Sequence, residues 1–331
     1  MSGLFANLVG QGQAVALMQA ALDQGRLAPA YLLAGADGVG RRLAAKRFLE
    51  GVIAGPAGDL AIRRRLEAGN HPDLLWLEPT YQHQGQLVPV SQAEAQGVNR
   101  RALPQLRLEQ VREVSRFLAR RPLESPRGLV VLEAAEAMAE GAANALLKTL
   151  EEPGDGLLLL ISAAPGQLLS TIRSRCQWIP FQRLDAGAMA QVMAQVMASA
   201  AMELEMEGAI EAAGASAGAD SAELLELAAG SPGALLHHRR QWQALPAGLA
   251  ERLLARERDP LALLGLARDL SEALDVEQQL WLLDWWQLVL WRQLRRPEPL
   301  HRLEKLRRQL RSYVQPRLAW EVCLLASATE P

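Results

Sequence analysis

The first half of the chain alternates short apolar runs with stretches of helical periodicity. The apolar runs predict three buried strands, at residues 30–34, 128–132 and 157–161. Apolar positions at helical spacing predict helices at residues 13–24, 41–53, 108–120 and 140–150. Strands that alternate with helices in this way indicate an α/β domain with a parallel sheet and helices on both of its faces.

Residues 54–105 interrupt the alternation. Within them His71–Glu78 is apolar enough to predict one further strand, and the remainder is expected to be irregular. Two basic patches, Arg63–Arg65 and Arg100–Arg101, fall in this insertion. A disordered polar loop is the favoured interpretation of the patches, and DNA contact is the alternative.

The composition and the hydrophobic pattern of the chain change after Pro180. From 185 to 238 it is rich in alanine and helical in pattern, and Ser231 followed by Pro232 predicts a helix start, with a cap before a first-turn proline. From Gln241 onward leucine, tryptophan and arginine alternate with helical period and no strand pattern occurs. The chain therefore divides into an α/β domain, a small helical domain and a helical bundle, at 1–183, 184–240 and 241–331.

Two features of the bundle have more than one interpretation. Large aromatics spaced along one helix most often pack in a core, and we expect this of Trp281, Trp285, Trp286 and Trp291. The arginines between 292 and 311 are expected to form a solvated face. Salt bridges between subunits, and less so DNA contacts, are the alternatives.

Composition narrows the class of protein. The chain has 331 residues, half of them hydrophobic and 22% charged, with a net charge of −2, which describes a globular protein without the basic excess typical of nucleic-acid binding. Its two cysteines lie far apart in sequence and cannot form a disulfide framework, so a reducing cytosol is expected. The apolar stretch 280–291 is too short to span a bilayer. We expect no bound zinc.

A phosphate-loop frame follows the first predicted strand and precedes a helix, with glycines at Gly35, Gly38 and Gly40. In a working loop the next two residues are a lysine, which reaches the outer phosphates, and a hydroxyl residue, which holds Mg²⁺. Here they are Arg41 and Arg42. Arg41 keeps the charge without the compact geometry of lysine, and Arg42 cannot ligate magnesium. The frame predicts a degenerate nucleotide site.

A second part of the predicted nucleotide site directly follows the strand at 128–132. Glu133 lies where it could approach a metal, but Ala134 stands where a hydrolase places the carboxylate that orients the attacking water. Glu136 lies two residues further on and is expected to point elsewhere. Arg42 and Ala134 together predict a site that does not hydrolyse ATP.

The segment Ser174–Arg175–Cys176 closes the run that begins with the apolar strand at 157–161. An arginine beside a nucleotide site suits one task, which is to hold a planar cation against a phosphate. Since the chain's own site lacks the residues to use ATP, Arg175 predicts action on another chain's nucleotide.

Three runs carry a resemblance to a known family: Leu8–Gln11, Ala143–Pro153 and Thr171–Cys176. With them, residues 4–183 resemble the clamp-loader branch of the AAA+ ATPases, and most nearly its delta-prime members in bacterial DNA polymerase III. The resemblance implies an AAA+ domain, a helical lid and a helical collar through which five subunits assemble.

For function, the resemblance implies a stator that works in a complex with gamma/tau and delta subunits, which loads a sliding clamp onto primed DNA. ATP would be bound by the neighbouring subunits, and Arg175 would reach into one of their sites as an arginine finger. Residues 50–80 contain none of the zinc-binding cysteines that some members carry. The alternatives are an ATP-hydrolysing gamma/tau-type motor and a switch that holds ATP without hydrolysing it.

Overall fold

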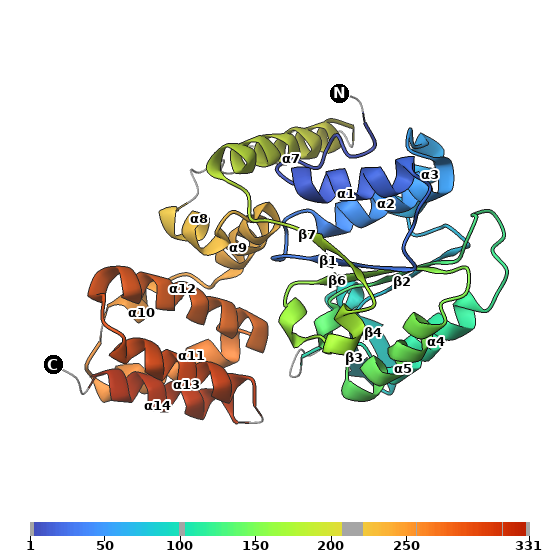
Figure 1. The fold of residues 1–331 in the computed structure, drawn as a ribbon. Helices are drawn as coiled ribbons and strands as arrows, with labels where there is room; N and C mark the ends of the chain where they lie inside the picture. Colours follow the sequence, from blue (N-terminus) through green and yellow to red (C-terminus); the bar gives the residue numbers. More distant parts are fainter. Residues whose placement is uncertain (1–2, 99–102, 207–220, 256, 313, 329–331) are drawn as a thin grey trace. The chain divides into compact units, whose positions relative to one another are not determined.

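The structure is a computed structural model that describes residues 3–98, 103–206, 221–255, 257–312 and 314–328 (Figure 1). The chain forms two compact units. The first comprises Met1–Gln96, Pro104–Ala215 and Gly230–Gly233, and the second consists mainly of Ser216–Ala229 and Ala234–Pro331.

The first unit is built on a parallel sheet of five strands in the order β2-β5-β6-β1-β7. The strands are β1 (Ala30–Ala34), β2 (Leu74–Leu77), β5 (Leu129–Leu132), β6 (Leu157–Ser162) and β7 (Gln177–Pro180). Every residue of β1, β5 and β6 is buried. Such continuous apolar strands form when both faces of a parallel sheet are covered.

Helices cover both faces of this sheet. On one face, α1 (Gly12–Asp23) and α2 (Arg41–Ala54) share a core with Leu33 and Val131. On the other, α4 (Leu108–Leu118) and α5 (Glu140–Glu151) share a core with Leu32 and Val130. Figure 1 shows α1, α2 and α3 on one side of the strands and α4 and α5 on the other. The predicted α/β fold class is confirmed.

The prediction for 54–105 is wrong in part. Beside the expected strand β2, the segment contains α3 (Leu60–Glu67), the antiparallel hairpin β3 (Thr80–His83) and β4 (Gln86–Pro89), and the short turn η1 (Val90–Gln92). The patch Arg63–Arg65 therefore lies on a helix, and Arg63 reaches the fully buried Glu50 with Nε 2.8 Å from Oε2. Arg100–Arg101 lies outside the described residues.

The second unit contains helices, as the sequence predicts. They are α8 (Ala222–Ala228), α10 (Leu249–Leu254), α11 (Pro260–Ala273), α12 (Val276–Leu294), α13 (Glu298–Leu310), α14 (Pro316–Ala328) and most of α9 (Pro232–Ala244). The helix start predicted at Ser231–Pro232 is confirmed. Helix α7 (Ala186–Met206) belongs to the first unit.

The tryptophan prediction holds for three of its four residues. Trp281, Trp285 and Trp286 on α12 are buried, whereas Trp291 is 40% exposed and Arg295 lies over its ring. The expectation of a solvated arginine face fails at Arg307, whose side chain is 14% exposed and pairs with Asp284 and Glu304. The pair with Asp284 joins α13 to α12, whereas the pair with Glu304 lies within α13.

Candidate functional site

The phosphate-loop frame forms between β1 and α2, in the context the sequence requires. Gly38 and Gly40 adopt φ values of 74° and 101°, a region that side chains with a Cβ rarely occupy. Gly40 is the N-cap of α2. Gly35 has a second constraint, because a Cβ there would lie 2.4 Å from the carbonyl oxygen of Phe181. The three glycines are thus required by the backbone of the loop itself.

Gln11 fixes the loop from the side. Its side chain is buried, and its Nε2 donates to the carbonyl oxygens of Val39 at 3.2 Å and Gln182 at 2.7 Å. Its Oε1 accepts from the amide of Gln182 at 3.0 Å. The sequence marks Gln11 only as part of the Leu8–Gln11 run. In the structure it links the loop to the segment that follows β7.

Arg41 does not extend into solvent. Its side chain is only 6% exposed and pairs with Asp37 on the loop, four residues earlier in the chain. Its Nη1 is buried without a hydrogen-bond partner among the described residues. The guanidinium at the lysine position is therefore held against the chain's own loop.

Arg42 pairs with Glu133, the residue that directly follows β5. Arg42 Nε lies 2.6 Å from Glu133 Oε1, and Trp76 Nε1 donates to the same oxygen at 2.9 Å. Arg42 and Lys46 both lie over the Trp76 ring, 5.7 and 5.8 Å from its centroid. Burial raises the pKa of Glu133, while Arg42 and the Trp76 hydrogen bond act in the opposite direction. An arginine thus contacts the carboxylate that would approach a metal in an active site.

The next acidic residue is also committed to the fold. Ala134 has a φ of 44°, and Glu136 follows on η2 (Ala135–Ala137). Glu136 Oε1 accepts from the amide of Ala163, just beyond β6, at 2.9 Å. Glu136 thus binds a backbone amide at the end of a neighbouring strand.

A segment distant in sequence packs on the phosphate loop. The Ser231 hydroxyl donates to the carbonyl oxygen of Asp37, and the Gly233 amide donates to that of Gly38 at 3.0 Å. A Cβ on Gly233 would lie 2.5 Å from Gly38 Cα. Sequence reasoning identifies Ser231 as a helix cap and misses this contact, which depends on two backbones meeting without side chains between them.

Arg175 lies after the short helix α6 (Ser170–Arg173) and before β7. Its Nη2 lies 2.8 Å from Glu151 Oε1, and its Nη1 donates to the carbonyl oxygen of Thr171 at 3.0 Å. The two paired side chains are 37% and 53% exposed. An exposed pair of this kind contributes about 0–1 kcal/mol to stability, so the guanidinium remains available to other partners.

The neighbours of Arg175 in the motif have structural contacts. Ser174 Oγ donates to the Thr171 carbonyl oxygen at 3.1 Å. Cys176 is half-buried against the core between the sheet and α5, and burial raises the pKa of its thiol to about 11. The structure thus brings together Gly35, Gly38, Gly40, Arg41, Arg42 and Glu133. The contacts of Arg175 among described residues are elsewhere, with α5 and α6.

No group of three or more His, Cys, Asp or Glu side chains with metal-binding geometry occurs within the described ranges. Among the helices that the structure describes, none is long and apolar enough to cross a membrane.

Two family models match the chain and together cover most of it. The model described as DNA polymerase III, delta subunit, matches residues 10–185, more than half of the chain. The model described as cyanobacterial DNA polymerase III delta prime, C-terminal domain, matches residues 187–327. The chain belongs to the DNA polymerase III delta-prime family. This family is part of the clamp-loader AAA+ proteins, so the resemblance inferred from the sequence motifs is confirmed.

Individual relatives agree with the family. The chain is 40% identical to the DNA polymerase III subunit delta' of Pseudomonas aeruginosa over 45% of its own length and 42% of the relative's. It is 34% identical to the delta' subunit of Bacillus subtilis over 54% of its own length and 50% of the relative's. The alignments thus span about half of these delta-prime relatives or less.

A solved structure supports the fold. The gamma subunit-related protein of DNA polymerase III from Thermotoga maritima superposes with a TM-score of 0.51 at 16% identity, over 96% of this chain and 98% of that one. At this identity the likeness shows a shared AAA+ fold.

Proposed function

We propose that the chain is the non-hydrolysing stator of a bacterial clamp loader and helps to load a sliding clamp onto primed DNA. The observation that carries the proposal is the ion pair between Arg42 and Glu133, 2.6 Å apart. In a hydrolysing site a hydroxyl residue and an acid at these positions serve Mg²⁺. Here the two positions neutralise each other, so the chain has no independent ATPase activity.

Arg175 then acts in trans on the nucleotide of a neighbouring subunit. Support comes from its exposure and from its weakly held pair with Glu151, since little stability is lost when the guanidinium leaves that partner. A planar guanidinium placed against the transferring phosphoryl group stabilises the charge of the transition state. The chain is therefore a catalytic contributor only within its complex.

The partners follow from the family. Relatives of the sheet domain include the tau/gamma subunit of Haemophilus influenzae, at 28% identity over 56% of this chain and 25% of that protein. We place gamma/tau and delta subunits beside this chain in a hetero-pentamer, with the clamp and the primed DNA met through the complex. Residues 1–183 form its AAA+ domain, 184–240 its lid and 241–331 its collar, and ATP is bound by the neighbours.

Reconstitution tests the function and separates it from a gamma/tau-type motor. The purified chain is mixed with gamma/tau and delta subunits, the complex is sized, and ATPase activity is measured with clamp and primed DNA. We expect no turnover by the chain alone and an assembly of about five subunits. Turnover by the chain alone that Arg41→Ala abolishes would establish the motor instead.

A further inference from the structure

A cavity of about 520 Å³ lies within the second unit, among α10, α11, α12, α13 and α14. Its volume is within the range of about 300–1,000 Å³ that is usual for ligand pockets. None of its lining residues belongs to the phosphate loop, since all of them lie at or after Arg252.

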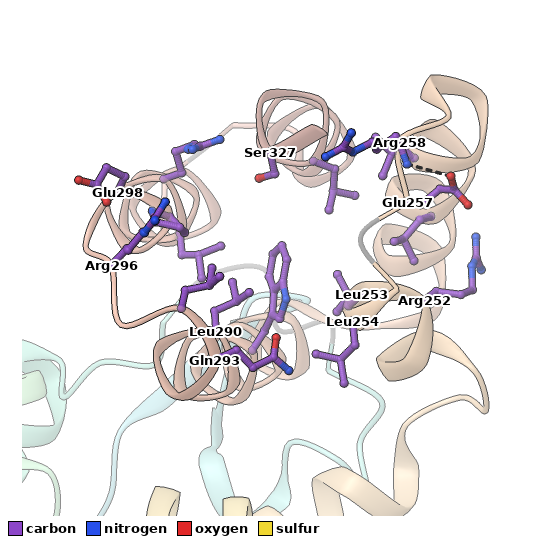
Figure 2. A pocket seen from close by; sticks show the side chains of 18 residues that line it. Arg252, Leu253, Leu254, Glu257, Arg258, Leu290, Gln293, Arg296, Glu298 and Ser327 are labelled. Atoms are coloured by element: carbon purple, nitrogen blue, oxygen red, sulfur yellow. Dashed lines mark hydrogen bonds between the residues drawn. The ribbon is translucent and has the colours of Figure 1, made fainter. Parts of the chain in front are cut away.

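The wall of the cavity is apolar. Leucines from all five helices and the Trp286 ring line it, and most of them are buried. In Figure 2 the labelled leucines Leu253, Leu254 and Leu290 lie around the open space. Apolar area on an occupant would gain roughly 25 cal/mol per Å² on leaving water, so the wall favours a large apolar group.

The rim of the cavity is basic. Four arginines and two glutamates line it: Arg252, Arg258, Arg296, Arg302, Glu257 and Glu298. Two of the arginines are engaged, because Arg252 pairs with Asp269 at 2.7 Å and Arg302 donates to the Ala326 carbonyl oxygen at 2.6 Å. Glu257 accepts from the backbone amides that follow it. Glu298 forms no ion pair with another described residue, so two arginines and one glutamate remain, and this positive excess favours an anionic occupant.

Arg258 and Arg296 are the two rim arginines whose side chains are not engaged in this way. Both are exposed, and neither side chain forms an ion pair with another described residue. Figure 2 shows them on opposite sides of the opening, Arg258 beside Glu257 and Arg296 beside Glu298. An occupant that satisfies both needs two separated anionic groups with an apolar group between them.

We propose that this cavity is a docking site for a peptide segment of a partner protein, with one or two large apolar side chains flanked on both sides by Asp or Glu. A fatty acid carries its single carboxylate at one end and would meet one arginine only. Single-stranded DNA offers repeated phosphates, but its bases need exposed aromatic faces to stack on, and the wall here consists mainly of leucine.

The test uses the full chain and a fluorescein-labelled peptide with a Leu-Phe-Leu core between two runs of three Asp. Two matched peptides replace the core by Ser-Ser-Ser or the Asp runs by Lys. We expect saturable binding of the first peptide in fluorescence anisotropy, weakened by added salt as surface charges are screened. Neither matched peptide should bind comparably.

Variants of the chain locate the site. Arg258→Glu with Arg296→Glu should weaken the peptide by roughly tenfold, since each reversal turns an exposed attraction into a repulsion. Leu254→Glu, at a half-buried position of the wall, should weaken it as well. Arg311→Glu is the matched control, because Arg311 is exposed and lies outside the lining, and it should bind normally.

Several outcomes would overturn the proposal. These are failure of the acidic apolar peptide to bind the wild-type chain, equal binding of the Ser-core peptide, and equal affinity for all three variants. Displacement of the peptide by dodecanoate or by a single-stranded oligonucleotide at lower concentration than by unlabelled peptide would reassign the cavity to that ligand class. None of these results depends on ATPase activity, so they are independent of the stator assignment.

Discussion

The phosphate loop and the loop after α6 both carry arginines, and the two loops treat them in opposite ways. Arg41, which is buried, pairs with the exposed Asp37, and Arg42, which is exposed, pairs with the largely buried Glu133. Both pairs lie beside a glycine frame that a second segment packs against. Arg175 has a partner too, but that partner, Glu151, is 53% exposed and Arg175 itself is 37% exposed. The comparison of Arg42 with Arg175 indicates that burial of the acid distinguishes the two pairs, since Glu133 is 13% exposed and Glu151 is 53% exposed, whereas Arg41 is held by its own burial against the loop.

The sharpest test of this contrast is Arg175→Ala in the reconstituted complex. We expect normal assembly and a large loss at the one ATP site that this residue serves, since fingers supplied in trans are worth roughly 10³–10⁵-fold in rate. The total ATPase falls by the share of that site. Steady-state ATPase with clamp and primed DNA measures it.

Two variants control that experiment. Glu151→Ala removes the partner and leaves Arg175 in place, so activity should be kept. Arg175→Lys keeps the charge without the planar fork and should recover little. Full activity of the Arg175→Ala complex would refute the finger.

Restoring the phosphate loop would make it resemble a working site. The double change Arg41→Lys with Arg42→Thr breaks the pair with Glu133 and supplies a hydroxyl for Mg²⁺. We expect Mg-ATP to bind at least about tenfold more tightly in an equilibrium titration, without turnover, because Ala134 still lacks a carboxylate. Arg41→Lys alone leaves the Arg42–Glu133 pair intact and should change little.

A smaller difference is expected between the unfolding free energies of variants in the two loops. Arg42→Ala leaves the Glu133 side chain, which is 13% exposed, without its cation, and we expect a loss of about 1–3 kcal/mol in unfolding free energy. Arg175→Ala breaks an exposed pair and should cost about 0–1 kcal/mol. Urea unfolding of both variants gives the comparison. Equal losses would mean that burial of the acid does not distinguish the two arginines.

The pH dependence of stability gives the smallest effect. Burial raises the pKa of Glu133 above its ordinary value of 4.5, so the folded chain holds this proton more tightly than the unfolded chain does. The stabilising contribution is fully present below pH 4.5 and is lost as the pH rises through the folded-state pKa. The wild-type chain should therefore lose stability relative to Glu133→Gln over that window. Arg42→Ala should extend the window upward, because Arg42 lowers this pKa.

Much of the sheet domain is predictable because its elements are locally self-consistent. The strand predicted at 30–34 coincides with β1, and the helix predicted at 41–53 differs from α2 by one residue. The helix α3 was missed because it is only eight residues long and carries three successive arginines. It is held by the Asp59 cap and by the buried Glu50, which is a tertiary contact. The strand β7 was missed because it is four residues long, half exposed, and defined by pairing with β1.

The candidate site was also predictable only in part, from its residue types but not from its long-range contacts. Residue types alone identified Arg41, Arg42 and Ala134 as departures from a working phosphate loop. They could not reveal that Arg42 reaches Glu133, because that contact joins residues 91 positions apart through the packing of α2 on the sheet. The prediction of a solvated face at 292–311 failed for the same reason, since Arg307 reaches Asp284 on the neighbouring helix α12.

The exposure of the Arg175–Glu151 pair has a consequence for kinetics. Exposed side chains exchange rotamers in picoseconds to nanoseconds, whereas turnover of ATP-dependent enzymes takes milliseconds or longer. Release of Arg175 from Glu151 requires only such an exchange and no opening of the backbone around α6. The guanidinium is thus always ready on the timescale of a catalytic cycle, and any slow step must be sought in the motion of whole subunits or in the chemistry at the neighbouring phosphate.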